Sequence, residues 1–429
     1  MKRVVICGLS HRAFNMFIQP LIEDFHMQYR ITGLLDIDDK RYTLCQERFP
    51  TLRGVPFFDE NEFDRMVKET KPDLVIVAGR DDTHVTYILQ ALDHHLDVIT
   101  EKPMVTTAKD AKKVIDKEAN SKGKVTVTFN YRYNPFHRKI KELILEGKIG
   151  RVTSVDLSWL IDTYHGASYF KRWNRTRQFS GGLSIHKSTH HFDLINWWIE
   201  QKPKQVFAYG ALNYYGNESP WNPLANEENR YCGTCQVKDE CRYESRWSPR
   251  VMRSKVEDDH IEASQAQSQL YSHYRPDACI FDGEIDIEDT YVASVAYDQG
   301  ALLNYSIQFS APYEGYRLAI NGTKGRIETN EFHVPSRIPF QYPEQTISYY
   351  PMFGAKETIE VVKQPGGHGG GDPLLLADLF LGKDPLIPYD ISAGAEAGAY
   401  SIALGEGMWR SVRENRPIEI EELFQKEPV

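Results

Sequence analysis

The sequence predicts an α/β protein in which a doubly wound parallel sheet precedes a second α/β domain with a large, mostly antiparallel open sheet. Three observations predict this fold class. The chain has 429 residues, which is longer than a single hydrophobic core usually supports. Up to about residue 130, short apolar runs alternate with amphipathic helical stretches. Beyond that point, longer runs show the two-residue alternation of antiparallel strands.

The first half of the chain, residues 1–130, predicts parallel strands joined by helical crossovers. Apolar residues at helical spacing fill the intervals between the strands, as in residues 83–95. Such alternation is typical of a doubly wound sheet. The expected strands are 4–8 (VVICG), 31–37 (ITGLLDI), 73–79 (DLVIVAG), 96–102 (LDVITEK) and 124–130 (KVTVTFN).

The second half, residues 131–429, predicts the antiparallel sheet and an insertion. A polar and aromatic stretch at about residues 213–289 interrupts the strand pattern. Small residues at helical spacing follow over 391–413, and a short strand is expected at 417–423. The expected longer strands are 151–161, 204–212, 290–298, 301–310 and 317–330.

Composition excludes several classes of partner. The net charge of -9 gives no bias toward polyanions, so we expect no nucleic-acid partner. No apolar run approaches the ~20 residues of a membrane span, so we expect no membrane partner. The first residues run directly into a predicted strand and are too short for a signal segment, which favours a cytoplasmic protein.

The end of the first predicted strand carries part of a dinucleotide-binding fingerprint. In CGLSHRA, Gly8 and Ala13 occupy the first and third small-residue positions, and Ser10 stands where a second glycine is usual. Asp36 ends the second strand at the spacing expected for a ribose hydroxyl. No arginine follows Asp36 directly, so the pattern favours NAD over NADP. A doubly wound domain without nucleotide is the alternative.

A third signal lies at residues 99–107, ITEKPMVTT. Glu101, Lys102 and Pro103 fall at the carboxyl end of a predicted strand, the edge at which open α/β sheets bind ligands. We therefore expect Glu101 and Lys102 at the cofactor site.

These segments, in this order, resemble the Gfo/Idh/MocA oxidoreductase family. The resemblance continues through residues 129–135 (FNYRYNP), 147–150 (GKIG), 181–194 and 321–328 (NGTKGRIE). It implies an N-terminal Rossmann domain, a C-terminal domain whose open sheet often forms a homo-oligomer, dimer or tetramer, and a sugar or polyol substrate. It also implies that Lys102 lies between nicotinamide and substrate.

The stretch GGLSIHKSTHHFDL, residues 181–194, places His186, His190, Asp193 and Trp197 on one stripe of a predicted helix. By the resemblance, His190 is the general base, and Lys102 would stabilise the developing alkoxide. His186 stands where the family usually has aspartate. It could serve as a second acid/base, or bind a metal with His190 and one of His165, His368 or Asp372. A purely structural role is the remaining alternative.

Two further segments supply substrate candidates. Residues 164–175, YHGASYFKRWNR, read as a loop whose aromatic and cationic side chains suit a carbohydrate. Residues 366–374, GGHGGGDPL, are too rich in glycine to predict regular structure. A surface loop and a plain linker are the respective alternatives. The substrate candidates are Arg132, Tyr164, His165, Arg172, Trp173, Lys187, Asp193 and His368.

The insertion contains Cys232-x2-Cys235-x5-Cys241. Three thiolates at this spacing could hold a structural zinc ion, with Cys279, His260 or His273 as the fourth ligand. Reduced cysteines without metal are the alternative.

Three function classes follow. The first is an NAD-dependent oxidoreductase acting on a secondary alcohol of a sugar, glycoside or cyclitol. The second is a lyase, glycosidase or epimerase that retains NAD for a transient redox cycle, which the extra histidine favours. The third is a ligand-binding protein that has lost catalysis. The presence of both Lys102 and His190 argues against the third.

Overall fold

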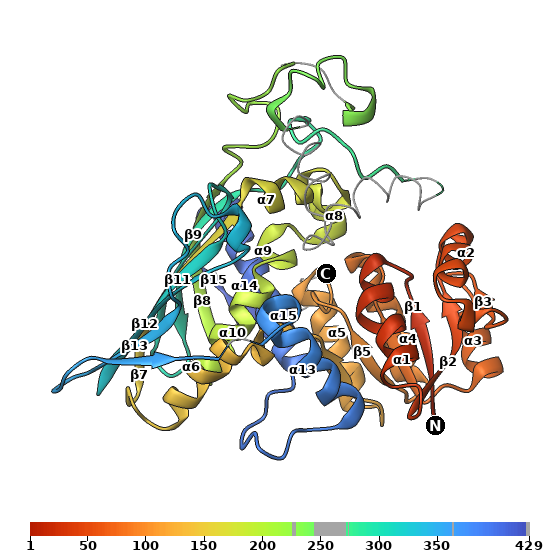
Figure 1. Ribbon diagram of the computed structural model, residues 1–429, viewed down its shortest axis with the longest axis horizontal. Helices are drawn as coiled ribbons and strands as arrows, with labels where there is room; N and C mark the ends of the chain where they lie inside the picture. The colour runs from red at the N-terminus through yellow and green to blue at the C-terminus, as the bar shows by residue number, and fades with distance from the viewer. Residues whose placement is uncertain (225–228, 244–271, 273, 363, 426–429) are drawn as a thin grey trace.

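A computed structural model describes residues 1–224, 229–243, 272, 274–362 and 364–425. It contains a six-stranded and a nine-stranded sheet, which lie on opposite sides of a helical middle layer (Figure 1). The predicted fold class is confirmed: the first sheet is parallel, and the second is antiparallel except for one strand pair.

The first sheet has the strand order β3-β2-β1-β4-β5-β6, and its neighbouring strands all run parallel. The central strands are buried on both faces because helices cover both sides, as in a doubly wound sheet. The strands are β1 (Lys2–Cys7), β2 (Tyr29–Leu35), β3 (Phe57–Phe58), β4 (Leu74–Val77), β5 (Asp97–Thr100) and β6 (Val125–Val127).

Side-chain caps fix where the crossover helices begin. Asp38 accepts a hydrogen bond from the Lys40 amide at 3.1 Å, and Thr107 accepts one from the Asp110 amide at 3.0 Å. The helical elements are the π-helix η1 (Ala13–Ile18), α1 (Gln19–Glu23), α2 (Asp39–Arg48), η2 (Pro50–Leu52), α3 (Phe63–Thr70), η3 (Asp81–Thr83), α4 (His84–Asp93) and α5 (Ala108–Ala119).

The second sheet has the order β14-β13-β12-β11-β7-β10-β9-β8-β15, with β7 and β10 parallel. The single strand expected over 317–330 is two, because the chain turns at Thr323 and Lys324 and pairs with itself. The sequence prediction missed β13 and β14. The strands are β7 (Val152–Asp162), β8 (Pro203–Ala211), β9 (Thr290–Tyr297), β10 (Leu302–Ala311), β11 (Gly315–Gly322), β12 (Gly325–Phe332), β13 (Thr346–Pro351), β14 (Glu357–Glu360) and β15 (Ile418–Glu419).

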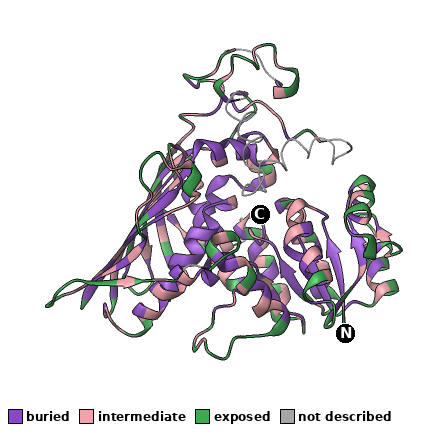
Figure 2. Ribbon diagram, viewed as in Figure 1, coloured by how far each residue is buried: buried purple, intermediate pink, exposed green. Residues whose placement is uncertain are grey.

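Helices cover the face of the second sheet that looks toward the first sheet, and burial alternates along its strands (Figures 1 and 2). The sequence between β8 and β9, which are adjacent in the sheet, contains the polar insertion. The helical elements are η4 (Asn130–Tyr133), α6 (Pro135–Leu145), α7 (Thr163–Phe170), η5 (Trp173–Arg175), α8 (Arg177–Ser180), α9 (Leu183–His186), α10 (Thr189–Ile199), η6 (Cys232–Thr234), η8 (Pro335–Arg337), α13 (Gly367–Leu381), α14 (Ala395–Glu414) and α15 (Ile420–Phe424).

Three local expectations are wrong. The expected loop at 164–175 is mostly the helix α7, because the Asp162 carboxylate caps it by accepting the amides of Tyr164 and His165 at 2.9 and 2.8 Å. The glycine-rich segment at 366–374 enters α13, with left-handed backbone at His368, Gly369 and Gly370. The stripe expected from His186 to Trp197 is divided, because His186 belongs to α9, although the helix expected through residues 190–200 is confirmed as α10.

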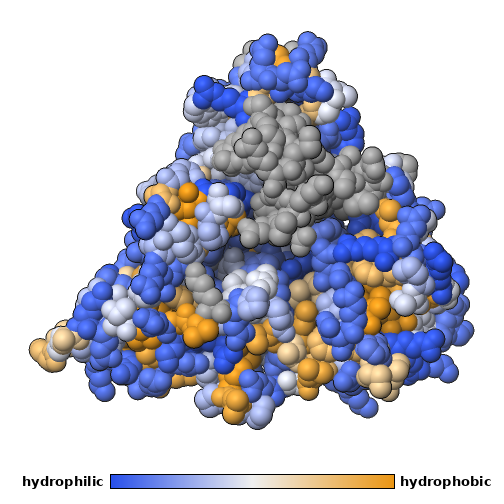
Figure 3. Space-filling model, in the orientation of Figure 1, coloured by the Kyte–Doolittle hydropathy of each residue, from blue (hydrophilic) through white to orange (hydrophobic). Residues whose placement is uncertain are grey.

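The C-terminal segment returns to the first sheet. The Val127 amide donates to the Ala393 carbonyl at 2.8 Å, and α14 packs against both α5 and β8. This helix therefore contacts both halves of the chain. In the face drawn in Figure 3, hydrophilic colour dominates, with apolar colour over the lower middle, where Figure 1 draws α13. Among the described residues, no helix is long and apolar enough to cross a membrane.

A buried ion pair ties η4 to α10. The Arg132 guanidinium donates to both Asp193 carboxylate oxygens, at 2.8 and 2.6 Å, and to the backbone carbonyl of Ser392 at 3.1 Å. Arg132 is 5% exposed and Asp193 1% exposed. Because neither charge contacts much water, each depends on the other for compensation.

We predict that Asp193→Asn lowers the free energy of unfolding by about 3–5 kcal/mol, since it leaves the Arg132 charge buried without its partner. Urea denaturation would measure the loss. The control is Asp116→Asn on α5, which breaks an exposed ion pair with Lys112 and should change stability by less than about 1 kcal/mol. Equal losses in both variants would contradict the structural role of the Arg132 pair.

Candidate active site

The carboxyl end of β1 turns sharply beside the end of β4. Gly8 has φ of +90°, and a Cβ at this position would lie 2.2 Å from the Gly79 backbone, so only glycine fits. Ser10 Oγ accepts the Ala13 amide at 3.1 Å and so begins η1. Ala13 is fully buried. The three fingerprint residues thus shape the turn that the sequence predicted.

Asp36 lies beside this turn at the end of β2. Its carboxylate accepts the Leu9 amide at 2.5 Å and the Asp38 amide at 3.0 Å. The Arg41 guanidinium donates to the Leu9 carbonyl. Burial raises the pKa of Asp36, although Arg41 and the two amides oppose that shift. Gly8, Ser10 and Asp36 therefore meet at one edge of the sheet, and they fit a dinucleotide.

Glu101 and Lys102 follow β5 at the same edge. Glu101 accepts the Arg12 guanidinium at 2.8 Å, and its other oxygen accepts the Lys102 amide at 3.3 Å. Within the described ranges, the Lys102 ammonium forms no ion pair. Burial lowers the pKa of Lys102, although Glu101, Asp81 and Asp372 act in the opposite direction.

His190 lies against an aromatic wall at the start of α10. Its ring stacks on Tyr131 with centroids 4.5 Å apart, and Phe129 meets it edge-on at 6.2 Å. His190 is 1% exposed, and its Nδ1 has no hydrogen-bond partner among the described residues. Burial, aided by the nearby charges of Lys102 and Lys187, lowers the pKa of His190 well below its usual value. The imidazole is therefore neutral at pH 7.

His186 has a different environment. Its Nδ1 lies 2.5 Å from the Asp81 carboxylate, which comes from η3 in the first half of the chain. Asn174 lies 3.2 Å from its other ring nitrogen. Burial lowers the pKa of His186, although Asp81 opposes the shift. The contact forms a carboxylate–imidazole pair between the two halves of the chain, suited to proton transfer.

Lys187 is almost completely buried, at 4% exposed. Its ammonium lies 3.5 Å from the Tyr131 hydroxyl and 5.6 Å from the centre of that ring. Within the described ranges, it forms no ion pair. Burial lowers the pKa of Lys187 to about 8, with Glu314 opposing the shift and Lys102 adding to it.

The helix α7 and the turn after it form a wall beside His186. Tyr169 and Trp173 both meet the His186 ring edge-on, at 5.5 and 5.7 Å. Arg172 lies close enough to lower the pKa of His186, and its Nε donates to the Ser168 carbonyl at 2.9 Å. Tyr164 is instead buried under the Arg337 guanidinium, 5.0 Å from its ring centre.

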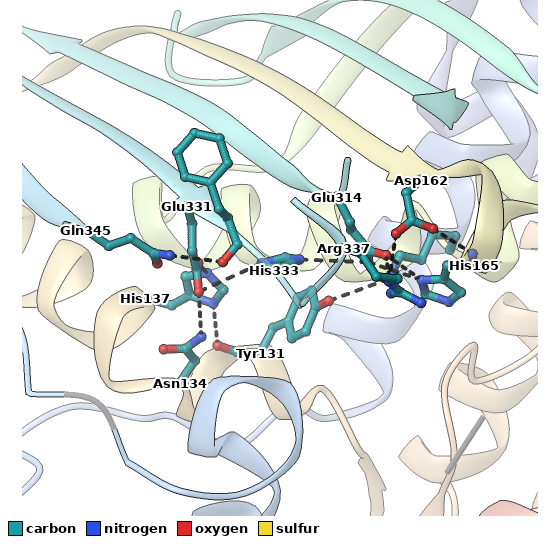
Figure 4. A network of polar contacts seen from close by, with 12 residues as sticks. Tyr131, Asn134, His137, Asp162, His165, Glu314, Glu331, His333, Arg337 and Gln345 are labelled. Atoms are coloured by element: carbon teal, nitrogen blue, oxygen red, sulfur yellow. Dashed lines mark hydrogen bonds and ion pairs between the residues drawn. The ribbon is translucent and has the colours of Figure 1, made fainter. Parts of the chain in front are cut away.

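His165 begins a buried polar network beneath this wall (Figure 4). It lies 3.0 Å from the Glu314 carboxylate and 2.8 Å from the Tyr169 hydroxyl. The network continues through His333 to Glu331 and His137. Burial alone would lower the pKa of His333, but Glu314 and Glu331 outweigh it and raise that pKa to about 9. His333 is thus a cation held between two carboxylates.

His368, from α13, lies beside Tyr131 and His190. It pairs with Asp372 at 3.0 Å, and its ring lies 5.3 Å from Tyr131 and 6.0 Å from His190. Asp372 also accepts a hydrogen bond from Asn130 at 2.6 Å. The glycine-rich backbone allows the left-handed turn, with φ of 52° at His368, that carries this imidazole.

The structure brings together Lys102, His186, Lys187, His190, His165, Arg172, Trp173 and His368. It places Arg132 and Asp193 in their own ion pair, so a substrate contact for these two stays a prediction. Sequence reasoning missed Asp81, Tyr131, Asn174 and Glu314 as partners. Tyr131 and Asn174 lay in segments that had attracted notice, residues 129–135 and 164–175. The other two, Asp81 and Glu314, are distant in sequence from the histidines that they contact.

In the insertion, Cys232, Cys235 and Cys241 line one small cavity together with Cys279. The other two proposed ligands, His260 and His273, lie outside the described residues.

Two family models match most of the chain. Residues 2–129 match the NAD-binding Rossmann fold of the Gfo/Idh/MocA oxidoreductases, and residues 141–420 match their C-terminal alpha/beta domain. The chain belongs to the Gfo/Idh/MocA oxidoreductase family. The expected resemblance is thereby confirmed, and the protein is an enzyme of this family with an NAD(P)-binding Rossmann domain.

Similar proteins include YteT of Bacillus subtilis strain 168, named only as an oxidoreductase, which is 71% identical over 429 residues and 100% of both chains. An inositol 2-dehydrogenase of Rubrobacter xylanophilus is 27% identical over 187 residues, 42% of this chain and 48% of its own. A levoglucosan dehydrogenase solved with NADH and levoglucosan superimposes with a TM-score of 0.65, at 14% identity, over 98% of this chain and 99% of its own. The last likeness concerns the fold alone.

We predict that Lys187→Met stabilises the protein at pH 7. Because the pKa of Lys187 is about 8 in the folded protein, against ~10.4 for an unfolded lysine, the buried charge costs about 3 kcal/mol below pH 8. This cost fades between about pH 8 and 10.4, where the unfolded chain binds more protons than the folded one. Urea unfolding of both proteins at pH 7 and pH 10 should show the gain at pH 7 shrinking at pH 10.

The control for this prediction is Lys112→Met, at a side chain that is 43% exposed. It should change stability by less than about 0.5 kcal/mol at either pH. A loss of stability in Lys187→Met at pH 7 would contradict the account of Lys187 as a buried, uncompensated cation.

Proposed function

We propose that this enzyme is an NAD-dependent oxidoreductase that acts on a secondary alcohol of a sugar, glycoside or cyclitol. One observation carries the proposal: the neutral imidazole of His190 lies close enough to Lys102 for its ammonium charge to lower the pKa of His190, and Lys102 forms no ion pair with the described residues. Alcohol oxidation needs these two groups beside one carbon.

His190 is the general base of the proposed reaction. Its low pKa keeps the ring unprotonated at pH 7, so a ring nitrogen can accept the proton of a carbinol O–H. The Lys102 ammonium stabilises the negative charge that develops on that oxygen. NAD, when bound, supplies the hydride acceptor. Gly8, Ser10 and Asp36 would hold it at the edge of the sheet, with Asp36 directed toward a ribose hydroxyl.

A carbohydrate substrate is supported by the composition of the wall. Tyr169 and Trp173 offer aromatic faces for the C–H patches of a sugar ring, while Arg172 and Lys187 offer donors for its hydroxyl groups. Both ring nitrogens of His165 contact Glu314 or Tyr169, so a substrate contact for His165 stays a prediction. The levoglucosan dehydrogenase with the same fold binds a sugar derivative, which is consistent with this class. Cytoplasmic location and a dimeric or tetrameric state stay predictions.

A second candidate function is a lyase, glycosidase or epimerase that retains NAD through a transient redox cycle. The His186–Asp81 pair favours it, because elimination or inversion next to an oxidised carbon needs a second acid/base group. The retained cofactor would return to its starting state in each turnover.

The experiment that separates the two functions begins with denaturing the purified protein and identifying the released small molecules by mass spectrometry. The dehydrogenase is supported if the purified protein contains no nicotinamide dinucleotide, binds added NAD, and forms NADH with a sugar or polyol. Stoichiometric NAD or NADH, with product formation but no net NADH, supports the retained redox cycle. Failure to release or bind any nicotinamide dinucleotide would overturn both.

For catalysis, we predict that His190→Gln lowers kcat by about 10²–10⁴-fold, because it removes the proton acceptor. The Kd for NAD should not change, since His190 lies on the substrate side. Steady-state kinetics and NAD titration would measure both quantities. His94→Gln, at an exposed histidine of the first domain that pairs with Asp64, is the control and should leave both unchanged. Unchanged kcat in His190→Gln would refute the role given to His190, whereas absence of turnover in the unaltered protein would favour the third class, a binding protein.

For cofactor choice, we predict that the enzyme binds NAD more tightly than NADP and that Asp36→Ala weakens NAD binding by about 10–100-fold. The expected size is that of one charge-assisted hydrogen bond, about 1.5–3 kcal/mol. Tighter binding of NADP by the unaltered enzyme would refute the role given to Asp36. Titrations with both dinucleotides would decide.

A further inference from the structure

The four cysteines at the base of the insertion line a single cavity. The cavity has room for about 20 Å³, which admits one water-sized or ion-sized occupant. No disulfide joins cysteines in the described structure. The lining residues are Pro223, Arg230, Cys232, Cys235, Lys238, Cys241, Cys279 and Phe281.

Backbone pairing brings the first and last cysteines together although 46 residues separate them in the sequence. Tyr231 and Ala278 form an antiparallel bridge. On either side of it, the Cys232 amide donates to the Asp277 carbonyl and the Cys279 amide to the Arg230 carbonyl, both at 2.8 Å. The register of this bridge thus holds Cys232 and Cys279 on adjacent chain segments.

Consecutive turns bring the two middle cysteines to the same place. The Cys235 amide donates to the Cys232 carbonyl at 3.3 Å, closing the 3-10 turn of η6. The Cys241 amide donates to the Val237 carbonyl at 2.9 Å. The Cys-x2-Cys segment therefore forms a tight turn, the arrangement in which paired thiolates commonly bind one metal ion.

A buried cation beside the thiols marks the cavity as a place for negative charge. Arg230 is 7% exposed, and its Nε and Nη1 have no hydrogen-bond partner in the described structure. Its Nη2 donates to Asn222 Oδ1 at 3.1 Å and to the Phe281 carbonyl at 3.0 Å. Unsatisfied guanidinium groups at this depth are costly unless an anion lies beside them. Thiolates on the cavity wall would supply that charge.

We propose that Cys232, Cys235, Cys241 and Cys279 bind one zinc ion as four thiolates. Four thiolates around Zn²⁺ carry a net charge of about -2, which Arg230 and Lys238 on the same wall offset. As the side chains stand, no three His, Cys, Asp or Glu residues in the described ranges are arranged to hold an ion. Binding therefore turns the thiol groups inward, and they release their protons to solvent.

The zinc site would stabilise one wall of the proposed active site. The Ala278 amide donates to the Lys171 carbonyl at 3.2 Å, and the Trp173 amide donates to the Tyr274 hydroxyl at 2.9 Å. The segment that ends at Cys279 thus lies behind the turn that carries Arg172 and Trp173. This consequence rests on the proposed function, whereas zinc binding itself does not.

The first test measures metal in the full-length protein, purified without chelators from zinc-supplemented medium. Mass spectrometry of the metals should find about one zinc per chain. Titrating the native protein with a mercurial, with a zinc indicator present, should release that zinc as the four thiols react. Absent zinc, iron in its place, or a disulfide between any of the four cysteines would overturn the proposal.

Variants then assign the ligands. Cys235→Ser and Cys279→Ser should each reduce bound zinc severalfold, while Cys45→Ala, at a buried cysteine of the first domain, should retain it. Because Cys→Ser variants can fail to fold, NAD titration of each variant checks the first domain separately. Full zinc content in a folded Cys279→Ser variant would overturn the assignment of the fourth ligand.

The functional consequence has its own readout. Zinc removal should raise the KM for the sugar or polyol severalfold and leave the Kd for NAD unchanged. If zinc removal left the KM unchanged, the inference that zinc stabilises the wall carrying Arg172 and Trp173 would be wrong. Zinc binding itself would not be affected by that result. Failure of every sugar and polyol to react, with zinc present at one per chain, would instead count against the proposed function.

Discussion

Two lysine ammonium groups, that of the buried Lys187 and that of the half-buried Lys102, lie at the candidate site without a carboxylate partner in the described structure. Each carboxylate near them is engaged elsewhere: Asp81 with His186, Glu101 with Arg12, Glu314 with His165 and Asp372 with His368. Burying such charges is costly, and the cost falls on stability while the site is empty. The rest of the structure must therefore supply enough stability to compensate for these two charges.

Burial, aided by these cations, determines the state of the nearby histidines His190 and His186. His190 stacks on Tyr131 and lies near both ammonium groups, so its imidazole is kept neutral. His186 has a carboxylate partner and lies further along the same segment. Two imidazoles four residues apart thereby acquire different proton affinities and partners. Environments that give neighbouring titratable groups different proton affinities are typical of acid/base sites.

Strong contacts around the site offset the loss of stability that the two lysine charges cause. The Arg132–Asp193 pair holds η4, which carries Tyr131, to α10, which carries His190. The ion network of Glu314, His333 and Glu331 supports the floor beneath α7. Natural enzymes commonly combine a destabilised site with a well-satisfied frame in this manner. The frame here consists of contacts between segments distant in sequence.

The sequence by itself determined the two sheets, the turn at Gly8, the positions of Asp36 and Lys102 at strand ends, and the family. These features follow from local periodicity and from residue types at fixed short spacing, which any chain segment displays before it folds. Only the tertiary structure decided which groups meet. Asp81 and His186 are separated by 105 residues, and His165 and Glu314 by 149. Such contacts form when the halves of the chain pack together, so no local pattern encodes the charge of Lys187 or the partner of His186. The helix α7 could be predicted only in part. Its capping residue Asp162 is visible in the sequence, but the glycine at 166 favoured a loop.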